Sequence, residues 1–124
     1  MQTLSESAIK VLCDTYTERA KVRNALGVAD LYTKDAIIMV SGRVVAQGLG
    51  EIARFLAEEY SADGWQPPQV TTLLKKVDFY EWGKIAIVPE RFVEHTGRNG
   101  RVFMHIILVD GVPKISLESI LYTC

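Results

Sequence analysis

The chain has 124 residues, of which 48% are hydrophobic and 23% are charged, and its formal net charge at pH 7 is -1. This length predicts one domain over residues 1–124, built around a single core. The near balance of acidic and basic residues argues against nucleic acid as a partner, because phosphate binding needs a basic surface.

The two cysteines give no disulfide framework, because Cys13 lies in a helical pattern and Cys124 is the last residue. The first residues are polar where a signal peptide would need an apolar stretch, and no apolar run approaches about 18 residues. We therefore expect a soluble, cytoplasmic protein in a reducing compartment, with no membrane partner.

Apolar side chains recur at helical intervals near the N-terminus and predict a helix over residues 4–22. Thr3 and Glu6 have the spacing of a capping box at its start. Asn24 can cap a second, short helix that runs through Tyr32.

The pattern changes to short strands after the second helix. Residues 36–40 and 43–47 are rich in β-branched side chains and flank Ser41-Gly42, which predicts a hairpin. Residues 49–60 return to a helical period with one apolar face, and residues 61–68 have the composition of a loop.

Four further strands are predicted, over residues 69–82, 84–95, 101–110 and 114–123. Asn99-Gly100 and Asp110-Gly111 are strong hairpin signals because these residues tolerate positive φ. Helices followed by an antiparallel meander predict an α+β fold in which the helices cover one face of a curved sheet.

Both faces of the predicted strand 101–110 are apolar, whereas a sheet with one face in water would alternate with polar residues. Helices can cover one face, and a second copy of the chain is the simplest cover for the other. We expect a homodimer through one apolar face, formed by Met104, Ile106, Leu108, Leu117 and Leu121.

The turn signals also predict a register. A two-residue turn at Asn99-Gly100 places Glu94 opposite His105, and a turn over DGVP places His105 opposite Glu118. One face would then gather a polar cluster of Glu90, Glu94, His105 and Glu118. A slip by one residue in either turn would break this grouping.

The stretch YTKDAIIMVSGRVVAQGLGEIARFL, residues 32–56, resembles a signature of the superfamily that includes nuclear transport factor 2, ketosteroid isomerase and the SnoaL-like polyketide cyclases. The matching positions are Tyr32, Asp35, Ala36, Gly42, Gly48, Ile52 and Phe55. The resemblance implies a cystatin-like cone, in which a curved antiparallel sheet wraps around a long N-terminal helix and encloses a pocket. It also implies dimers through the back of the sheet. Because this fold serves enzymes, binders and dimerisation modules alike, it does not fix a function.

The isomerase branch of this superfamily implies three further roles. A helix tyrosine and a strand acid form an oxyanion hole, and an aspartate after the first strand moves the proton. By position, these roles fall at Tyr16, His105 and Val40. Because valine cannot carry a proton, isomerisation by that route is not expected.

The leading hypothesis is a SnoaL-like pocket protein that binds a compact apolar ligand with a polar end. Whether it also performs acid/base chemistry of the isomerase, cyclase or hydrolase type stays open at this point. The catalytic candidates are His105, Glu118 and Tyr16. The ligand-binding candidates are Glu90, Phe92, Phe103, Ile107, Ile120, Tyr32 and Val40.

Two alternatives accompany this hypothesis. The chain could be a non-catalytic homodimerisation or protein-interaction module whose cavity is filled by its own side chains. His105 could be a buried structural histidine instead of a general acid or base whose pKa is set by a carboxylate. We expect no cofactor and no metal, since His95 should point away from the other candidate ligands.

Overall fold

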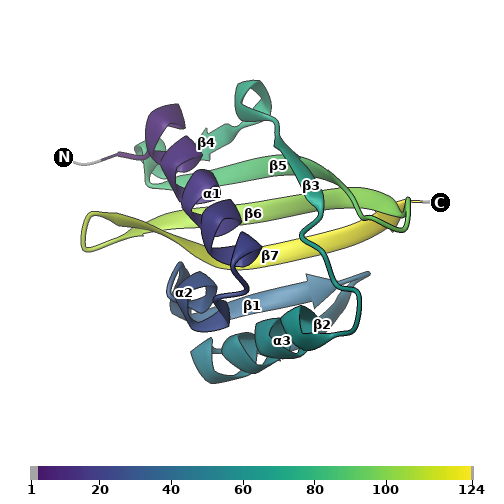
Figure 1. Ribbon diagram of the computed structural model, residues 1–124. Helices are drawn as coiled ribbons and strands as arrows, with labels where there is room; N and C mark the ends of the chain where they lie inside the picture. Colours follow the sequence, from purple (N-terminus) through teal and green to yellow (C-terminus); the bar gives the residue numbers. More distant parts are fainter. Residues whose placement is uncertain (1–2, 124) are drawn as a thin grey trace.

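The computed structural model describes residues 3–123 and has an α+β architecture, as predicted (Figure 1). Its helices are α1 (Glu6–Lys21), α2 (Ala25–Ala29) and α3 (Leu49–Ser61), with the short 3-10 turns η1 (Leu74–Lys76) and η2 (Glu81–Gly83). Its strands are β1 (Tyr32–Val40), β2 (Arg43–Gln47), β3 (Gln69–Thr72), β4 (Asp78–Tyr80), β5 (Ile85–Val93), β6 (Asn99–Val109) and β7 (Val112–Thr123). In the described part of the chain, no helix is both long and apolar enough to cross a membrane.

The strands form one sheet in the order β2-β1-β7-β6-β5-β3, and β4 pairs separately with β5. The β1–β7 pair is parallel and the other pairs are antiparallel. In Figure 1, α1 lies across the face of β5, β6 and β7, while α3 lies along β1 and β2. The core therefore forms between the helices and the inner face of the sheet.

The start of α1 differs from the predicted capping box. Ser5 is the N-cap, and its side-chain oxygen accepts a hydrogen bond from the Ala8 N–H at 3.1 Å. The backbone N–H of Leu4 donates to the Gly83 carbonyl at 2.7 Å, so Leu4 is held against the η2 turn and is not helical. The Asn24 cap is confirmed, since its side chain accepts from the Gly27 N–H at 2.9 Å.

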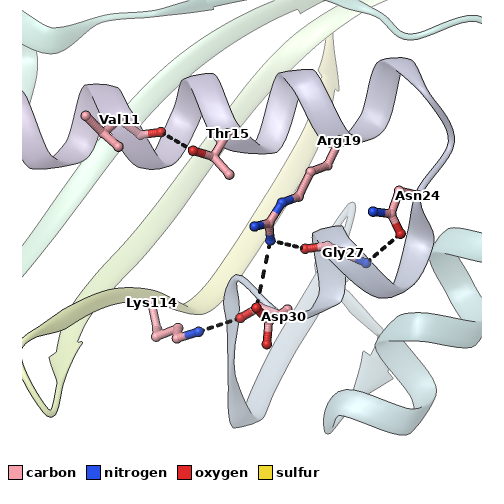
Figure 2. A network of polar contacts seen from close by, with 7 residues as sticks. All are labelled: Val11, Thr15, Arg19, Asn24, Gly27, Asp30 and Lys114. Atoms are coloured by element: carbon pink, nitrogen blue, oxygen red, sulfur yellow. Dashed lines mark hydrogen bonds and ion pairs between the residues drawn. The ribbon is translucent and has the colours of Figure 1, made fainter.

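A polar network fixes the end of α1 against α2 and β7 (Figure 2). The Arg19 guanidinium donates to the Gly27 carbonyl at 2.6 Å and lies 3.8 Å from the Asp30 carboxylate. The Lys114 ammonium donates to the Asp30 carbonyl, also at 2.6 Å. These contacts hold the junction that leads from α1 into β1, where Tyr32 begins the strand.

The hairpin between β5 and β6 turns at a different place from the one predicted. The loop spans Glu94 to Arg98, closed by the Glu94 N–H donating to the Arg98 carbonyl at 2.7 Å, and Gly97 supplies the positive φ of 88°. Asn99 and Gly100 lie inside β6, opposite Val93 and Phe92. The residue opposite His105 is consequently Ile87, so the predicted pairing of Glu94 with His105 is wrong.

The hairpin between β6 and β7 does turn at Asp110-Gly111, but it is tighter than predicted, because Val109 pairs with Val112. The register then shifts between His105 and Ile106, which leaves Ser116 as the extra residue of a β-bulge. Below the bulge His105 is opposite Leu117, and Glu118 is opposite Met104. The predicted pairing of His105 with Glu118 is therefore wrong by one residue, and the two side chains lie on opposite faces.

The same register corrects the predicted dimer face. Met104 and Ile106 are buried in the core and Leu108 packs against it, so these three belong to the inner face. Leu117 and Leu121 pair with His105 and Arg101 on the outer face. The five residues therefore do not form a single surface.

The predicted strand 69–82 is divided into β3 and β4 by η1. The Leu73 N–H donates to the Pro89 carbonyl at 3.0 Å, and Leu74 packs against the core. An apolar side chain that turns inward at this point interrupts the alternation of a single long strand.

Gly100 is needed because of close packing. A Cβ atom at this position would lie 2.4 Å from the Leu121 carbonyl oxygen and 2.6 Å from the Phe92 ring. We expect Gly100→Ala to lower the free energy of unfolding by about 2 kcal/mol, as overpacking does, measured by chemical denaturation. The matched control is Gly50→Ala in α3, where a Cβ atom meets nothing within 4 Å. The control should stabilise the helix by about 0.5 kcal/mol or more, and equal effects at both positions would contradict the register described above.

Candidate functional site

A cavity of about 290 Å³ lies between α1, α3 and the inner face of the sheet. Its walls are mainly apolar and aromatic, with rings contributed by Phe55, Tyr60, Trp65, Phe92 and Tyr122. Small-molecule pockets start at about 300 Å³ and are walled in this way, with a few polar groups among the apolar ones. The size therefore suits a compact ligand.

The polar end of the cavity is built by three elements. Tyr32 on β1 donates its hydroxyl hydrogen to Glu118 Oε1 on β7, and the hydroxyls of Tyr32 and Tyr16 on α1 lie 3.4 Å apart. Glu118 is only 6% exposed, yet Glu118 and Tyr16 both line the cavity. We refer to Glu118, Tyr32 and Tyr16 as the inner polar cluster.

Burial raises the pKa of Glu118 from its ordinary value of 4.5 to about 7. The hydrogen bond from Tyr32 opposes this shift, and the negative charge of Glu90 adds to it. Burial and the Glu118 charge also raise the pKa of Tyr16 and of Tyr32, so both phenols stay protonated. A carboxyl group with a pKa near neutral can both accept and donate a proton, which is the property of a general acid or base.

Glu90 is a second buried carboxyl group on the inner face, 7% exposed, and it also lines the cavity. Its Oε2 accepts a hydrogen bond from the Thr72 hydroxyl at 2.8 Å. Burial raises its pKa, and the Thr72 hydrogen bond opposes the shift. The nearby Cys13 thiol has its pKa raised to about 12 by burial and by the Glu90 charge, so it is not a reactive nucleophile.

The remaining polar groups lie further along the cavity wall. The Tyr122 hydroxyl donates to Glu94 Oε1 at 3.1 Å, and the Arg98 guanidinium lies 3.5 Å from the centre of the Tyr122 ring. Burial, and then the charge of Glu94, raises the pKa of Glu59. Among residues 3–123, no three His, Cys, Asp or Glu side chains are grouped in a way that could hold a metal ion.

The candidate residues named from the sequence fall into two groups. The cavity is lined by Tyr16, Val40, Glu90, Phe92, Glu118 and Ile120, while Tyr32 lies behind Glu118 and contacts it. His105, with Phe103 and Ile107, lies on the alternate positions of β6, which point to the outer face. His105 is opposite Ile87 and Leu117, so the expectation that it faces the pocket is wrong.

Sequence reasoning missed Tyr60 and Tyr122 as cavity residues, and Thr72 as the hydrogen-bond donor to Glu90. Tyr122 could have been found, because it alternates with Ile120 and Glu118 along one face of β7. Thr72 could not, because its contact with Glu90 depends on the register between β3 and β5.

Solved structures with the same fold are similar to this chain over almost its whole length. An NTF-2-like protein of unknown function from Shewanella oneidensis has a TM-score of 0.78 at 13% identity, covering 93% of this chain and 97% of that chain. A ketosteroid isomerase-like protein from Erwinia carotovora atroseptica has a TM-score of 0.71 at 15% identity, covering 95% of each chain. A scytalone dehydratase-like protein from Novosphingobium aromaticivorans has a TM-score of 0.71 at 15% identity, covering 95% of this chain and 83% of that chain.

No protein-family model matches the chain, and no curated protein matches it. At these identities the structural matches establish the fold alone. The chain has the α+β fold of the NTF-2-like and ketosteroid isomerase-like proteins, which confirms the fold implied by the resemblance of residues 32–56.

Glu118→Gln tests the buried carboxyl group. A raised folded-state pKa means that the unfolded chain loses this proton first, so the free energy of unfolding falls as the pH rises from about 4.5 to about 7. The wild-type protein should lose on the order of 3 kcal/mol of unfolding free energy over this range. Glu118→Gln should remove this loss and leave only the smaller pH dependence that comes from Glu90. Urea unfolding from pH 4.5 to 8 measures the change.

The control for this experiment is Glu58→Gln, which changes an exposed carboxylate of α3 and should leave the pH profile unchanged. A wild-type protein that gains stability across this pH range would contradict the burial of Glu118.

Proposed function

We propose that the chain binds a compact, mainly apolar small molecule in the cavity, with the polar end of the ligand at the inner polar cluster. The observation that carries this proposal is a buried carboxyl group, that of Glu118, which accepts a hydrogen bond from Tyr32 in the wall of an apolar cavity of about 290 Å³. Apolar walls supply affinity for the body of the ligand, and the few polar groups supply its orientation.

We further propose that Glu118 is the general acid or base of an isomerase, cyclase or hydrolase type reaction. It takes the place that sequence reasoning gave to His105. Tyr32 orients the carboxyl group through its hydrogen bond, and Tyr16 is placed to contact the substrate. Neighbours described as ketosteroid isomerase-like and scytalone dehydratase-like support proton-transfer chemistry in this type of cavity.

The alternative function, a module with a self-filled cavity, is less well supported. A filled cavity would leave no volume beside Tyr16 and Glu118, whereas the described side chains leave about 290 Å³ there. The apolar wall of the cavity also includes buried carboxyl groups. If the core had only a structural role, replacing those carboxyl groups with hydrocarbon would stabilise it.

Assembly as a homodimer is a separate proposal. The outer face of the sheet carries half-buried apolar side chains, among them Ile87, Phe103, Ile107 and Leu117. A second copy of the chain packed on this face would remove them from water. Sedimentation velocity should give a dimer mass that falls to the monomer mass in Ile107→Lys, and a monomeric wild type would refute the proposal.

Ligand binding can be tested with a neutral fluorescent reporter, N-phenyl-naphthylamine, whose emission rises in an apolar site. We expect the wild-type chain to bind it. Val40→Phe should weaken binding by about 10-fold or more, which is about 1.4 kcal/mol, because the new ring occupies the cavity.

The control for this test is Val44→Phe, which places the same ring at a position that is 56% exposed on β2. This variant should bind the reporter as the wild type does. Equal binding by both variants, or none by the wild type, would exclude the cavity as the binding site.

A further inference from the structure

The charges that line the cavity are all of one kind apart from a histidine. Four carboxyl groups line it, from Glu59, Glu90, Glu94 and Glu118, and the other ionisable groups are His95, Cys13 and tyrosines. No lysine or arginine is among the lining residues. The ion pairs in the described chain join Lys10 to Asp14, Arg19 to Asp30 and Lys21 to Glu18, all away from the cavity.

Two hydroxyl hydrogens beside the buried carboxyl groups are already donated to them. A hydroxyl group has one hydrogen to donate. Tyr32 gives its hydrogen to Glu118 Oε1, and Thr72 gives its hydrogen to Glu90 Oε2. The Tyr32 hydroxyl also lies 3.4 Å from the Tyr16 hydroxyl.

One oxygen of Glu118 has no donor, whereas Glu90 is hydrogen-bonded by the Thr72 hydroxyl and by the Cys13 thiol. The described chain contains no enclosed side-chain polar atom without a partner, so Glu118 Oε2 is not enclosed, and Glu118 lines the cavity. The end of the cavity at Glu118 therefore presents a free acceptor, which a ligand that carries a donor can satisfy.

We propose that the cavity selects a compact apolar molecule that ends in a protonated primary amine, with the ammonium group held by Glu118 and Glu90. This inference rests on the proposed function and names its ligand class. An ammonium group carries three donors and a positive charge, so it can donate charge-assisted hydrogen bonds to these carboxyl groups, the free Glu118 oxygen among them. It also supplies the counter-charge without which a buried carboxylate is costly.

Two further features of the cavity favour a cation over a neutral donor. Aromatic rings of the cavity already attract cations, since the Arg23 guanidinium lies 5.4 Å from the centre of the Trp65 ring and the Arg98 guanidinium lies 3.5 Å from that of Tyr122. Glu59 and Glu94 add negative potential along the wall, which raises the local concentration of cations and excludes anions.

The test uses three ligands that share one ring system and differ in the polar end: naphthylethylamine, naphthylethanol and naphthylacetate. Calorimetric titration at pH 8 keeps the amine protonated and Glu118 ionised, since its pKa is about 7. We expect the amine to bind about 10-fold more tightly than the alcohol, and the acetate to bind most weakly. Equal or tighter binding of the alcohol or the acetate, or no binding of the amine, would overturn the inference.

A variant series assigns the preference to the carboxyl groups. Glu118→Gln keeps an acceptor for Tyr32 but removes the charge, so it should lower the affinity for the amine by about 10-fold and leave the alcohol nearly unchanged. Glu58→Gln, which changes an exposed carboxylate outside the cavity, should alter neither affinity. Circular dichroism establishes that each variant is folded, and Glu90→Gln replaces Glu118→Gln if the latter does not fold. An amine preference that persists in both carboxyl variants would place the selectivity elsewhere.

The two proposals fail in different ways. If the alcohol binds as tightly as the amine and Val40→Phe abolishes both, the cavity is a binding site without amine selectivity, and only the present inference falls. If Val40→Phe changes the affinity for none of the three ligands, the cavity is not the binding site, and both the proposed function and the present inference are wrong.

Discussion

The candidate site depends on keeping one carboxyl group, that of Glu118, inside an apolar cone. Burial disfavours the charged form of this group, and the hydrogen bond from Tyr32 is the interaction that offsets part of the cost. That bond requires the parallel pairing of β1 with β7, which places Ile38 beside Glu118 and brings the start of β1 to the inner face. It also requires the bulge at Ser116, because without the extra residue the alternation along β7 would point Glu118 outward.

The same arrangement separates stability from function. Two buried carboxyl groups and an open volume of about 290 Å³ are features that a core selected for stability alone would replace with hydrocarbon. The scaffold around them is tightly packed, as the close contacts at Gly100 show, and Arg19, Asp30 and Lys114 fix the junction before β1. A rigid wall with a costly polar end is the expected balance of a binding or catalytic site.

Local patterns in the sequence predicted the elements better than their pairing. Helical periods and the Asn24 cap located α1, α2 and α3, whereas the register depended on the Gly97 loop and the Ser116 bulge, which have no distinctive signal. Both register errors were an odd number of residues, since Ile87 and Leu117 are opposite His105 where Glu94 and Glu118 were expected. Because each shift is odd, the two faces of β6 are exchanged relative to β5 and to β7. The faces of β5 and β7 keep the predicted relation to each other. This is why Glu90 and Glu118 were correctly grouped while His105 was placed on the wrong face.

The position of the carboxyl group limits what the cavity can process. In the isomerase branch that the sequence resembles, the proton is moved by an acid after the first strand, at the position of Val40 in this chain. Val40 pairs with Ile120, and Ile38 pairs with Glu118, so the carboxyl group lies two residues away from that position along β7. Two strand residues span about 6.6 Å. A proton moved at Glu118 would therefore belong to a different part of a bound ligand from a proton moved at the position of Val40.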